Sequence, residues 1–157
     1  MNKQILAFKL SKDKIAILGA LSSNEIEELL ENLIRKEYKK GEIIFRQNSS
    51  PEYIYIIDQG EVEIRFKSEK NNYLLKKYSQ GECFGQIAIL GIAPNFGECT
   101  AISDITIFQL SKFSFHKLSK ENNKLFTKLL LNLTREISRY SYYITNKFID
   151  KIEENSV

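Results

Sequence analysis

The sequence predicts an α+β fold, mainly β, in which helices flank a central set of short strands. Several β-rich segments alternate with turns at regular spacing, which is typical of a barrel or a sandwich. Helical patterns lie before and after these segments, and a length of 157 residues suits one domain with its own core. We therefore expect a single domain over residues 1–157, with N-terminal helices at about 1–32, the strands at 33–110 and C-terminal helices at 111–157.

The composition is that of an ordinary soluble globular chain, with 43% hydrophobic residues, 27% charged residues and a formal net charge of +3. So small a charge does not by itself argue for nucleic acid or a membrane as partner. No apolar run approaches membrane-spanning length. The two cysteines, Cys83 and Cys99, are too few for a disulfide scaffold. We expect both to be small buried residues of a cytoplasmic protein.

Two helices are predicted before the first strand. A short one covers Lys12–Leu21 and ends near Gly19. The second begins at Ser22, because Ser22 and Glu25 have the spacing of a capping box. The apolar spacing predicts that this helix buries one face, made of Ile26, Leu29, Leu30 and Leu33.

A run of charged residues, Arg35–Lys40, precedes the first clear strand. It is either a nucleic-acid patch or a solvated strand edge before a turn, and the second interpretation is favoured. Turn residues at Asn48–Pro51 end the first clear strand. The strands are predicted at Glu42–Gln47, Tyr53–Ile57, Glu61–Lys67, Tyr73–Tyr78 and, as two short segments, within Cys99–Leu110.

The stretch Gly81–Ala101 contains a brief apolar run, Ile87–Leu90, between glycines and a proline. It is too short for an independent helix, so we expect one or two helical turns between strands. A helix that begins at a glycine leaves its first backbone N–H groups free, and such an end suits an anion such as phosphate. The alternative is that Gly85 only permits a tight corner, and that Ile87 and Leu90 fill the barrel interior.

The last helix is predicted to begin at Ser119 or Glu121, after a short element that starts at Ser111. It carries an apolar stripe with alternating steps of four and three residues, which is the spacing of a coiled coil. We expect a homodimer through this stripe; the alternative is that the stripe packs only on the chain's own strands. The stripe consists of Phe126, Leu130, Leu133, Ile137, Tyr140 and Ile144.

Three segments resemble the cyclic nucleotide-binding domain family. Phe84–Leu90 together with Pro94–Ala101 is similar to its phosphate-binding cassette. Gly41–Phe45 resembles its Gly-x-x-Ile-Phe strand, and Tyr55–Ile64 resembles its Tyr-x-Ile-x-x-Gly-x-Val-x-Val hairpin. The resemblance implies a β-roll, that is a double-stranded β-helix or jelly roll, with a phosphate-cassette helix, N-terminal helices and a long C-terminal helix. It also implies ligand-binding positions at Gly85, Gln86, Ile87, Ala88, Asn95 and Phe96.

The chain departs from the family pattern at those ligand positions. The family's glutamate for the ribose hydroxyl is Gln86, and its arginine for the cyclic phosphate is Asn95, which has no charge. The next residue, small in the family, is Phe96, which would be bulky where the phosphate sits. Loss of a buried counter-charge costs on the order of 3–5 kcal/mol, about a thousandfold in affinity. The resemblance therefore predicts a cassette that keeps its shape and no longer binds a cyclic phosphate normally.

Two functions from the same fold follow. The first is a stand-alone regulatory or interaction module that signals by contact with an unidentified protein partner. It is expected not to bind DNA directly, since no helix-turn-helix follows the last helix. It is also expected to need no cofactor. The second is a sensor of cyclic AMP, cyclic GMP or another small anion, in which Arg135 or Arg139 supplies the missing charge and Ser141 and Thr145 reach a base.

An enzyme is the least favoured function. The only histidine is His116, in a predicted surface helix. No Ser/His/Asp set, metal-spaced cluster or paired carboxylates stand out in the sequence. We therefore expect no catalytic residues and no metal.

Overall fold

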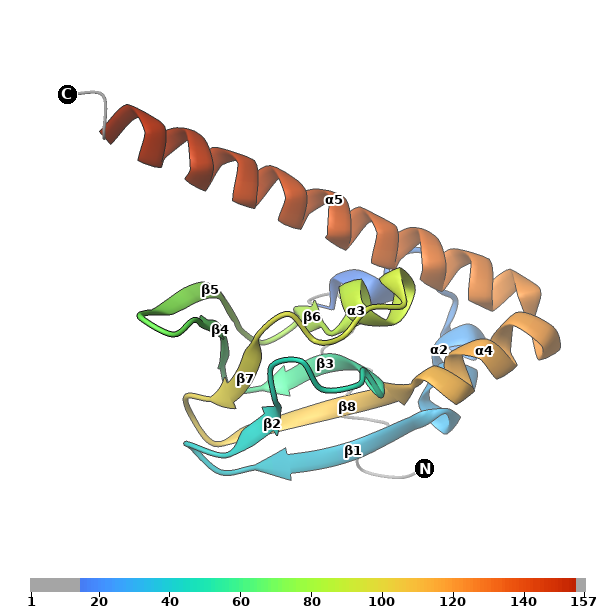
Figure 1. The fold of residues 1–157 in the computed structure, drawn as a ribbon. Coiled ribbons are helices and arrows are strands. Elements are labelled where there is room, and N and C mark those ends of the chain that lie inside the picture. Colours follow the sequence, from blue (N-terminus) through green and yellow to red (C-terminus); the bar gives the residue numbers. More distant parts are fainter. Residues whose placement is uncertain (1–14, 155–157) are drawn as a thin grey trace.

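The computed structural model describes residues 15–154 and contains two four-stranded antiparallel sheets (Figure 1). The first has the order β1-β8-β3-β6 and the second the order β2-β7-β4-β5. The first sheet comprises β1 (Leu33–Tyr38), β8 (Ile105–Ser111), β3 (Tyr53–Gln59) and β6 (Cys83–Phe84). The second comprises β2 (Ile43–Phe45), β7 (Glu98–Ala101), β4 (Val62–Lys67) and β5 (Asn72–Tyr78). The helices lie before, between and after these strands, so the α+β, mainly β, β-roll prediction is confirmed.

The first sheet is covered on both faces, which explains why β3 is an almost continuous apolar run. Ile54 and Ile56 of β3 belong to a cluster formed with the helices. Tyr55 and Ile57 point the other way, into a cluster between the two sheets. Successive residues of a strand face opposite sides, so a strand that is buried on both sides loses the alternation that marks a half-exposed one.

The N-terminal part contains η2 (Ala16–Leu18), a single 3-10 turn, and α2 (Ser23–Glu31). The predicted helix at Lys12–Leu21 falls partly outside the described residues. The capping box is confirmed: the Ser22 backbone N–H donates to Glu25 Oε2 at 2.7 Å, and the Glu25 N–H donates to Ser22 Oγ at 3.3 Å. The prediction that Leu33 lies on the helix is wrong, because α2 ends at Glu31 and Leu33 begins β1.

Strand β1 contains most of the charged run. It pairs with β8 and lies at the edge of its sheet, and Arg35, Lys36 and Glu37 are exposed or nearly so. The solvated strand edge was therefore the correct interpretation. Both cysteines are free and buried, as expected.

Helices α4 (Lys112–Glu121) and α5 (Asn123–Glu154) follow β8. Ser111 begins α4 by accepting a hydrogen bond from the Ser114 N–H at 3.0 Å. Helix α5 crosses the helical face of the molecule, and its C-terminal end extends away from the sheets (Figure 1). Between residues 15 and 154, no helix has the length and apolarity needed to cross a membrane.

The predicted stripe on α5 packs largely against the chain itself. Leu133 is buried in the helical cluster, and Phe126 and Leu130 pack on that cluster. Tyr140 and Ile144 line a cavity. Ile144 remains 39% exposed, so a dimer contact through the stripe stays a prediction. The N-terminal part of the stripe, Phe126, Leu130 and Leu133, thus packs on the chain's own core.

Lys128 of α5 holds the start of α2. Its Nζ lies 2.8 Å from Glu25 Oε2 and 3.1 Å from the Ala20 carbonyl oxygen. The Lys128 ammonium, and next the backbone N–H of Ser22, lower the pKa of Glu25 from 4.5 to about 2. The ionised carboxylate therefore contributes stability above its unfolded pKa, and that contribution is lost as the pH falls toward 2.

We expect Glu25→Gln to lower the free energy of unfolding by about 1 kcal/mol at pH 7, since solvent screens part of the pair. Below pH 3 the difference from the native chain should shrink, because the native Glu25 also loses its charge as the pH approaches 2. Urea unfolding between pH 7 and pH 2.5 measures both. A difference that stays constant over this range would exclude the ion pair as the cause.

Candidate ligand cavity

The site begins at a corner that requires glycine. Strand β6 ends at Phe84, and Gly85 is the N-cap of α3 (Gln86–Gly91) with a φ of 86°. A Cβ on Gly85 would lie 2.7 Å from the Tyr53 carbonyl oxygen and 2.9 Å from the Tyr55 ring. Only glycine combines this left-handed backbone with so close an approach. The prediction of one or two helical turns between strands is confirmed.

Helix α3 forms one wall of a cavity of about 540 Å³. Residues of β4, β5 and the segment before β7 form other walls, and α5 contributes Tyr140 and Ile144. The structure thus brings together all six positions that the resemblance implied. These are Gly85, Gln86, Ile87, Ala88, Asn95 and Phe96.

The cavity has no charged wall: within the described chain, none of its lining residues is Lys, Arg, Asp or Glu. Asn95 is 5% exposed, and its Nδ2 donates to Ser49 Oγ at 3.0 Å. Its backbone is bonded to the same loop, with Asn95 N–H donating to Ser49 O at 3.0 Å and Asn48 N–H to Asn95 O at 2.8 Å. The residue at the position of the family's arginine therefore binds a loop of its own chain.

Gln86 contributes an unused acceptor. The residue is 3% exposed, and its Oε1 has no hydrogen-bond partner among the described residues. A buried polar atom without a partner costs about 1–3 kcal/mol. The atom has almost no accessible surface, so a ligand in the cavity does not reach it unless the Gln86 side chain moves.

Phe96 does not fill the cavity, contrary to the expectation from the sequence. Its ring stacks on Phe66 with centroids 4.8 Å apart, and 68% of the residue is exposed. Phe66 follows a register shift in the pairing of β4 with β5, between Ile64 and Arg65. The stacking contact with Phe66 holds the Phe96 ring at the rim of the cavity and out of its interior.

Neither candidate arginine of α5 lines the cavity. Arg135 Nη1 donates to Asn132 Oδ1 at 2.8 Å, and Asn132 in turn binds the Ile17 and Gly19 carbonyl oxygens. Arg139 pairs with Glu136 one turn earlier. In this structure neither arginine supplies a charge to the cavity lining, because each is bound to a residue of its own helix.

Ser141 and Thr145 are not in the lining either, since both are exposed. The uncharged Tyr140 faces the cavity, and burial raises the pKa of its hydroxyl.

Two lining aromatic residues were not recognised from the sequence as parts of the site. Phe45 ends β2 and Tyr78 ends β5. Burial raises the pKa of the Tyr78 hydroxyl, so this group remains neutral. Their positions at strand ends next to turns were the available signal.

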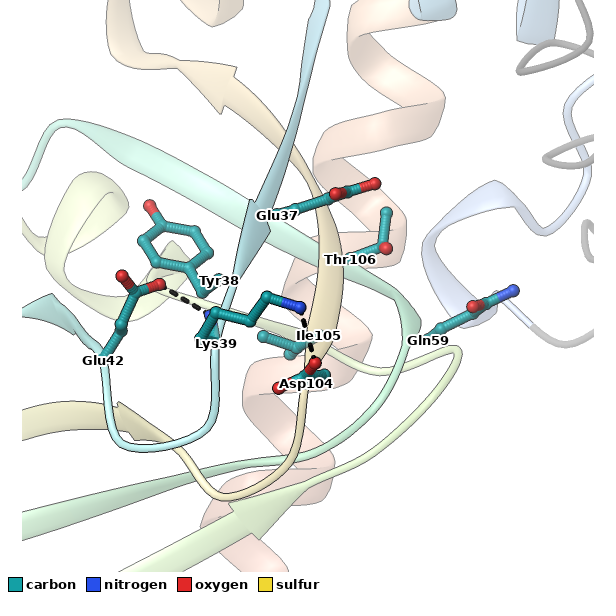
Figure 2. Close-up of a pocket in the computed structure, with 8 residues that line it drawn as sticks. All are labelled: Glu37, Tyr38, Lys39, Glu42, Gln59, Asp104, Ile105 and Thr106. Carbon is teal, nitrogen blue, oxygen red and sulfur yellow. Dashed lines mark hydrogen bonds and ion pairs between the residues drawn. The ribbon is translucent and has the colours of Figure 1, made fainter.

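A second cavity, beyond the Tyr38 end of β1, is lined mainly by polar residues (Figure 2). Lys39 Nζ lies 2.8 Å from Asp104 Oδ2, and the Lys39 backbone N–H donates to Glu42 Oε2 at 2.6 Å. Glu37 adds a third carboxylate, paired with Arg35 at 2.7 Å. This cavity repels anions, and its charges already have partners, so the apolar cavity is the better candidate site.

Two packed antiparallel sheets, with a short helix at a glycine corner and a long helix closing one cavity, define a ligand-binding β-roll. The sequence model of the family described as cyclic nucleotide-binding domain matches residues 35–122 of this chain, which is more than half of its length. The chain belongs to this family.

Curated relatives and solved structures agree with this assignment. The cAMP-dependent protein kinase regulatory subunit of Debaryomyces hansenii is 28% identical over 117 residues, which are 74% of this chain and 25% of that protein. This chain thus spans about a quarter of that relative's length. A cyclic nucleotide-binding domain from Methylobacillus flagellatus has a TM-score of 0.85 at 19% identity, and 95% of this chain and 84% of that one are covered.

A regulatory subunit of a cAMP-independent protein kinase A from Trypanosoma brucei has a TM-score of 0.75 at 20% identity, covering 92% of this chain and 52% of that one. At such identities the two solved structures show the fold alone.

Proposed function

We propose that this domain is a regulatory module that acts by contact with a partner protein, and that its cassette does not hold a cyclic nucleotide in the family's manner. One observation carries the proposal: no cationic side chain lines the cassette cavity in the described chain, and Asn95 is bonded to Ser49. A phosphate that leaves water needs a partner charge.

The backbone of α3 does not replace that charge. The helix has only six residues, Gln86–Gly91. The partial positive charge at a helix start contributes about 0.3–1 kcal/mol to an anion. A lost buried counter-charge costs on the order of 3–5 kcal/mol. The cost of the lost counter-charge exceeds the contribution of the helix start, so the net free energy disfavours a bound phosphate.

A sensor of cyclic nucleotides or small anions is the second candidate, favoured by the retained glycine corner at Gly85. Titration of cyclic AMP and cyclic GMP into the purified protein, followed by melting temperature, separates the two. We expect no rise at micromolar ligand. A rise of several degrees would support the sensor and contradict the charge argument.

The proposal includes a non-catalytic, cytoplasmic protein whose target is a protein rather than DNA. The regulatory name of the relatives supports a non-catalytic role. The one histidine, His116, is exposed on α4. No group of three His, Cys, Asp or Glu side chains among residues 15–154 is placed to hold a metal ion.

We also propose a homodimer through α5, on a different surface from the stripe that the sequence indicated. An uncharged line of exposed residues, here called the outer stripe, runs along α5 with alternating steps of four and three. It consists of Thr127, Leu131, Thr134, Ser138, Ser141, Thr145, Phe148 and Ile152.

Large apolar side chains are exposed on or beside this stripe: Leu131 at 51%, Tyr142 at 75%, Phe148 at 66%, Ile149 at 46% and Ile152 at 50%. Small hydroxyl residues between them allow two helices to approach closely. The spacing is that of a coiled-coil seam, and an exposed apolar face of this kind favours a partner surface. A second copy of the same stripe is the proposed occupant.

A further inference from the structure

The loop after α3 presents an isoleucine in an unfavourable state. Ile92 is the C-cap of α3, and its φ of 50° and ψ of 48° lie in the left-handed region. A β-branched residue is strained in this region. The residue is also 93% exposed, so its apolar side chain lies in water. Strained residues tend to lie at functional sites, and an exposed apolar side chain in this state indicates a contact outside the isolated chain.

The loop holds this isoleucine in a fixed position. The Ala93 N–H donates to the Ala88 carbonyl oxygen at 3.1 Å. Three residues after Ile92, both the backbone N–H and the side chain of Asn95 donate hydrogen bonds to Ser49. An apolar side chain on a rigid loop loses little conformational entropy when a partner covers it. Ile92 is therefore suited to a protein contact.

A hollow of about 550 Å³ lies beside Ile92 and reaches the start of α4. It is lined by the loop between β2 and β3, by α3 with the loop that follows it, and by Lys112. The Lys112 Nζ lies 5.5 Å from the centroid of the Phe113 ring, and 74% of Phe113 is exposed. Two exposed apolar side chains, those of Ile92 and Phe113, thus lie at and beside the hollow.

The exposed side of α4 extends this surface with positive charge. Its residues follow the i, i+3, i+4, i+7 spacing of one helical face, here called the α4 face. It consists of Phe113, His116, Lys117 and Lys120. Lys117 pairs with Glu121 at 3.5 Å, and Lys112 pairs with Glu52 at 2.8 Å. Lys120 has no acidic partner among residues 15–154, and no acidic residue lines the hollow in that part of the chain.

From these observations we propose that Ile92, the hollow and the α4 face bind an acidic segment of a partner protein, with an apolar side chain of that segment in the hollow. This inference rests on the proposed function, a module that acts by protein contact, and names the surface that makes the contact. Burial of Ile92 and Phe113 supplies affinity. The positive charge of Lys120 selects for an acidic partner, because complementary charges at an interface determine specificity more than affinity.

A protein segment fits this surface better than an anionic membrane does. A membrane is broad and cannot place a single side chain in the hollow. The carboxylates of Glu52 and Glu121 belong to the same surface and would be repelled by anionic head groups. A protein segment can place its acidic side chains next to Lys120 and away from these two carboxylates.

Synthetic peptides of stated composition test the chemistry of the partner. The first peptide alternates leucine with glutamate, the second has lysine in place of glutamate, and the third has serine in place of leucine. In a titration of the full chain followed by amide NMR signals, we expect the first peptide to shift the signals of Ile92 and Phe113. It should bind at least about tenfold more tightly than either of the others, equivalent to about 1.4 kcal/mol.

If the first peptide leaves these signals unshifted at millimolar concentration, the docking surface is overturned. The proposed function is unaffected by that result, because its own test is the titration with cyclic nucleotides. Equal binding of the glutamate and lysine peptides would overturn the assignment of an acidic partner. Tighter binding to phosphatidylserine vesicles than to the first peptide would overturn the assignment of a protein partner.

Ile92→Gly tests the apolar contact without harming the fold. Glycine adopts the left-handed backbone freely, so the melting temperature should stay close to that of the native chain. We expect the first peptide to bind at least about tenfold more weakly. The matched control is Ile34→Ser, which removes an isoleucine that is 54% exposed on β1 and should leave peptide affinity unchanged. Equal affinities of the native chain and Ile92→Gly would overturn the role of Ile92.

Lys120→Glu tests the charge on the α4 face. We expect about tenfold weaker binding of the first peptide, because a carboxylate then faces the peptide's own carboxylates. The matched control is Lys70→Glu, which makes the same change of charge in the exposed turn between β4 and β5, at the other end of the molecule from α4 (Figure 1). The control should bind the peptide like the native chain. An equal loss in both variants would attribute the effect to net charge and overturn the assignment of the α4 face.

Discussion

Asn95→Arg is expected to raise the affinity for cyclic AMP or cyclic GMP by at least about a hundredfold, which corresponds to about 2.7 kcal/mol. Asn95 lines the cavity and is 5% exposed. A guanidinium at this position would face the cavity without a competing carboxylate, since no acidic residue of the described chain lines it. The fork of donors in arginine matches phosphate oxygens, and burial strengthens the pair.

The gain is expected to be smaller than the 3–5 kcal/mol that a lost buried counter-charge costs. One reason is that Asn95→Arg removes the hydrogen bond from Asn95 Nδ2 to Ser49 Oγ. The backbone bonds of Asn95 to Ser49 and Asn48 do not depend on the side chain and should keep the loop in place. Calorimetric titration of the variant with each cyclic nucleotide measures the gain.

The control for this experiment is Asn95→Gln, which lengthens the side chain without adding charge and should leave cyclic nucleotide binding undetectable. An equal gain in both variants would attribute the effect to loosening of the loop at Ser49. No gain in Asn95→Arg, with an unchanged melting temperature, would show that a counter-charge is not what the cavity lacks.

Much of the cassette could be predicted because its constraints are local. The left-handed backbone at Gly85 and the close approach of Tyr53 leave only glycine at that position. The capping box joins Ser22 and Glu25, which are three positions apart, and it could be recognised from the sequence in the same way. The left-handed corner and the capping box depend on neighbours in the sequence, which a pattern can detect, whereas the contact of Gly85 with Tyr53 comes from a distant strand.

The side-chain environment of the cavity depends on distant contacts and was harder to predict. The direction of Phe96 is set by Phe66 on β4. The role of Arg135 is set by Asn132, which bonds carbonyl oxygens of the N-terminal turn. Neither contact follows a period in the sequence. The bulk of Phe96 alone therefore suggested a blocked cavity, and the charge of Arg135 alone suggested a substitute for the missing arginine.

The orientation of α5 illustrates a different limit. The apolar period was detected, but period alone does not say whether a face meets the same chain or another one. Leu133, Phe126 and Leu130 of the stripe pack on the core, and the outer stripe lies on another side of the helix, where hydroxyl residues alternate with a few large apolar ones. Its coiled-coil spacing is visible once serine and threonine are counted as seam residues that permit close approach.

Thr145→Glu is expected to weaken the homodimer by at least about a hundredfold. Thr145 lies within the outer stripe and is exposed. In a symmetric parallel pair of helices each Thr145 would face the seam next to its copy, so the substitution brings two carboxylates together. Like charges juxtaposed at an interface cost several kcal/mol. Sedimentation equilibrium over a range of protein concentrations measures the dissociation constant.

The matched control is Asn146→Glu, which adds the same charge one residue further along. Successive helical residues are about 100° apart, so Asn146 lies off the outer stripe, and it is exposed. The control should dimerise like the native chain, and both variants should keep the native melting temperature at concentrations where the chain is a monomer. If Thr145→Glu and Asn146→Glu have the same dissociation constant, the outer stripe is not the seam, because added charge then acts without regard to the face that carries it.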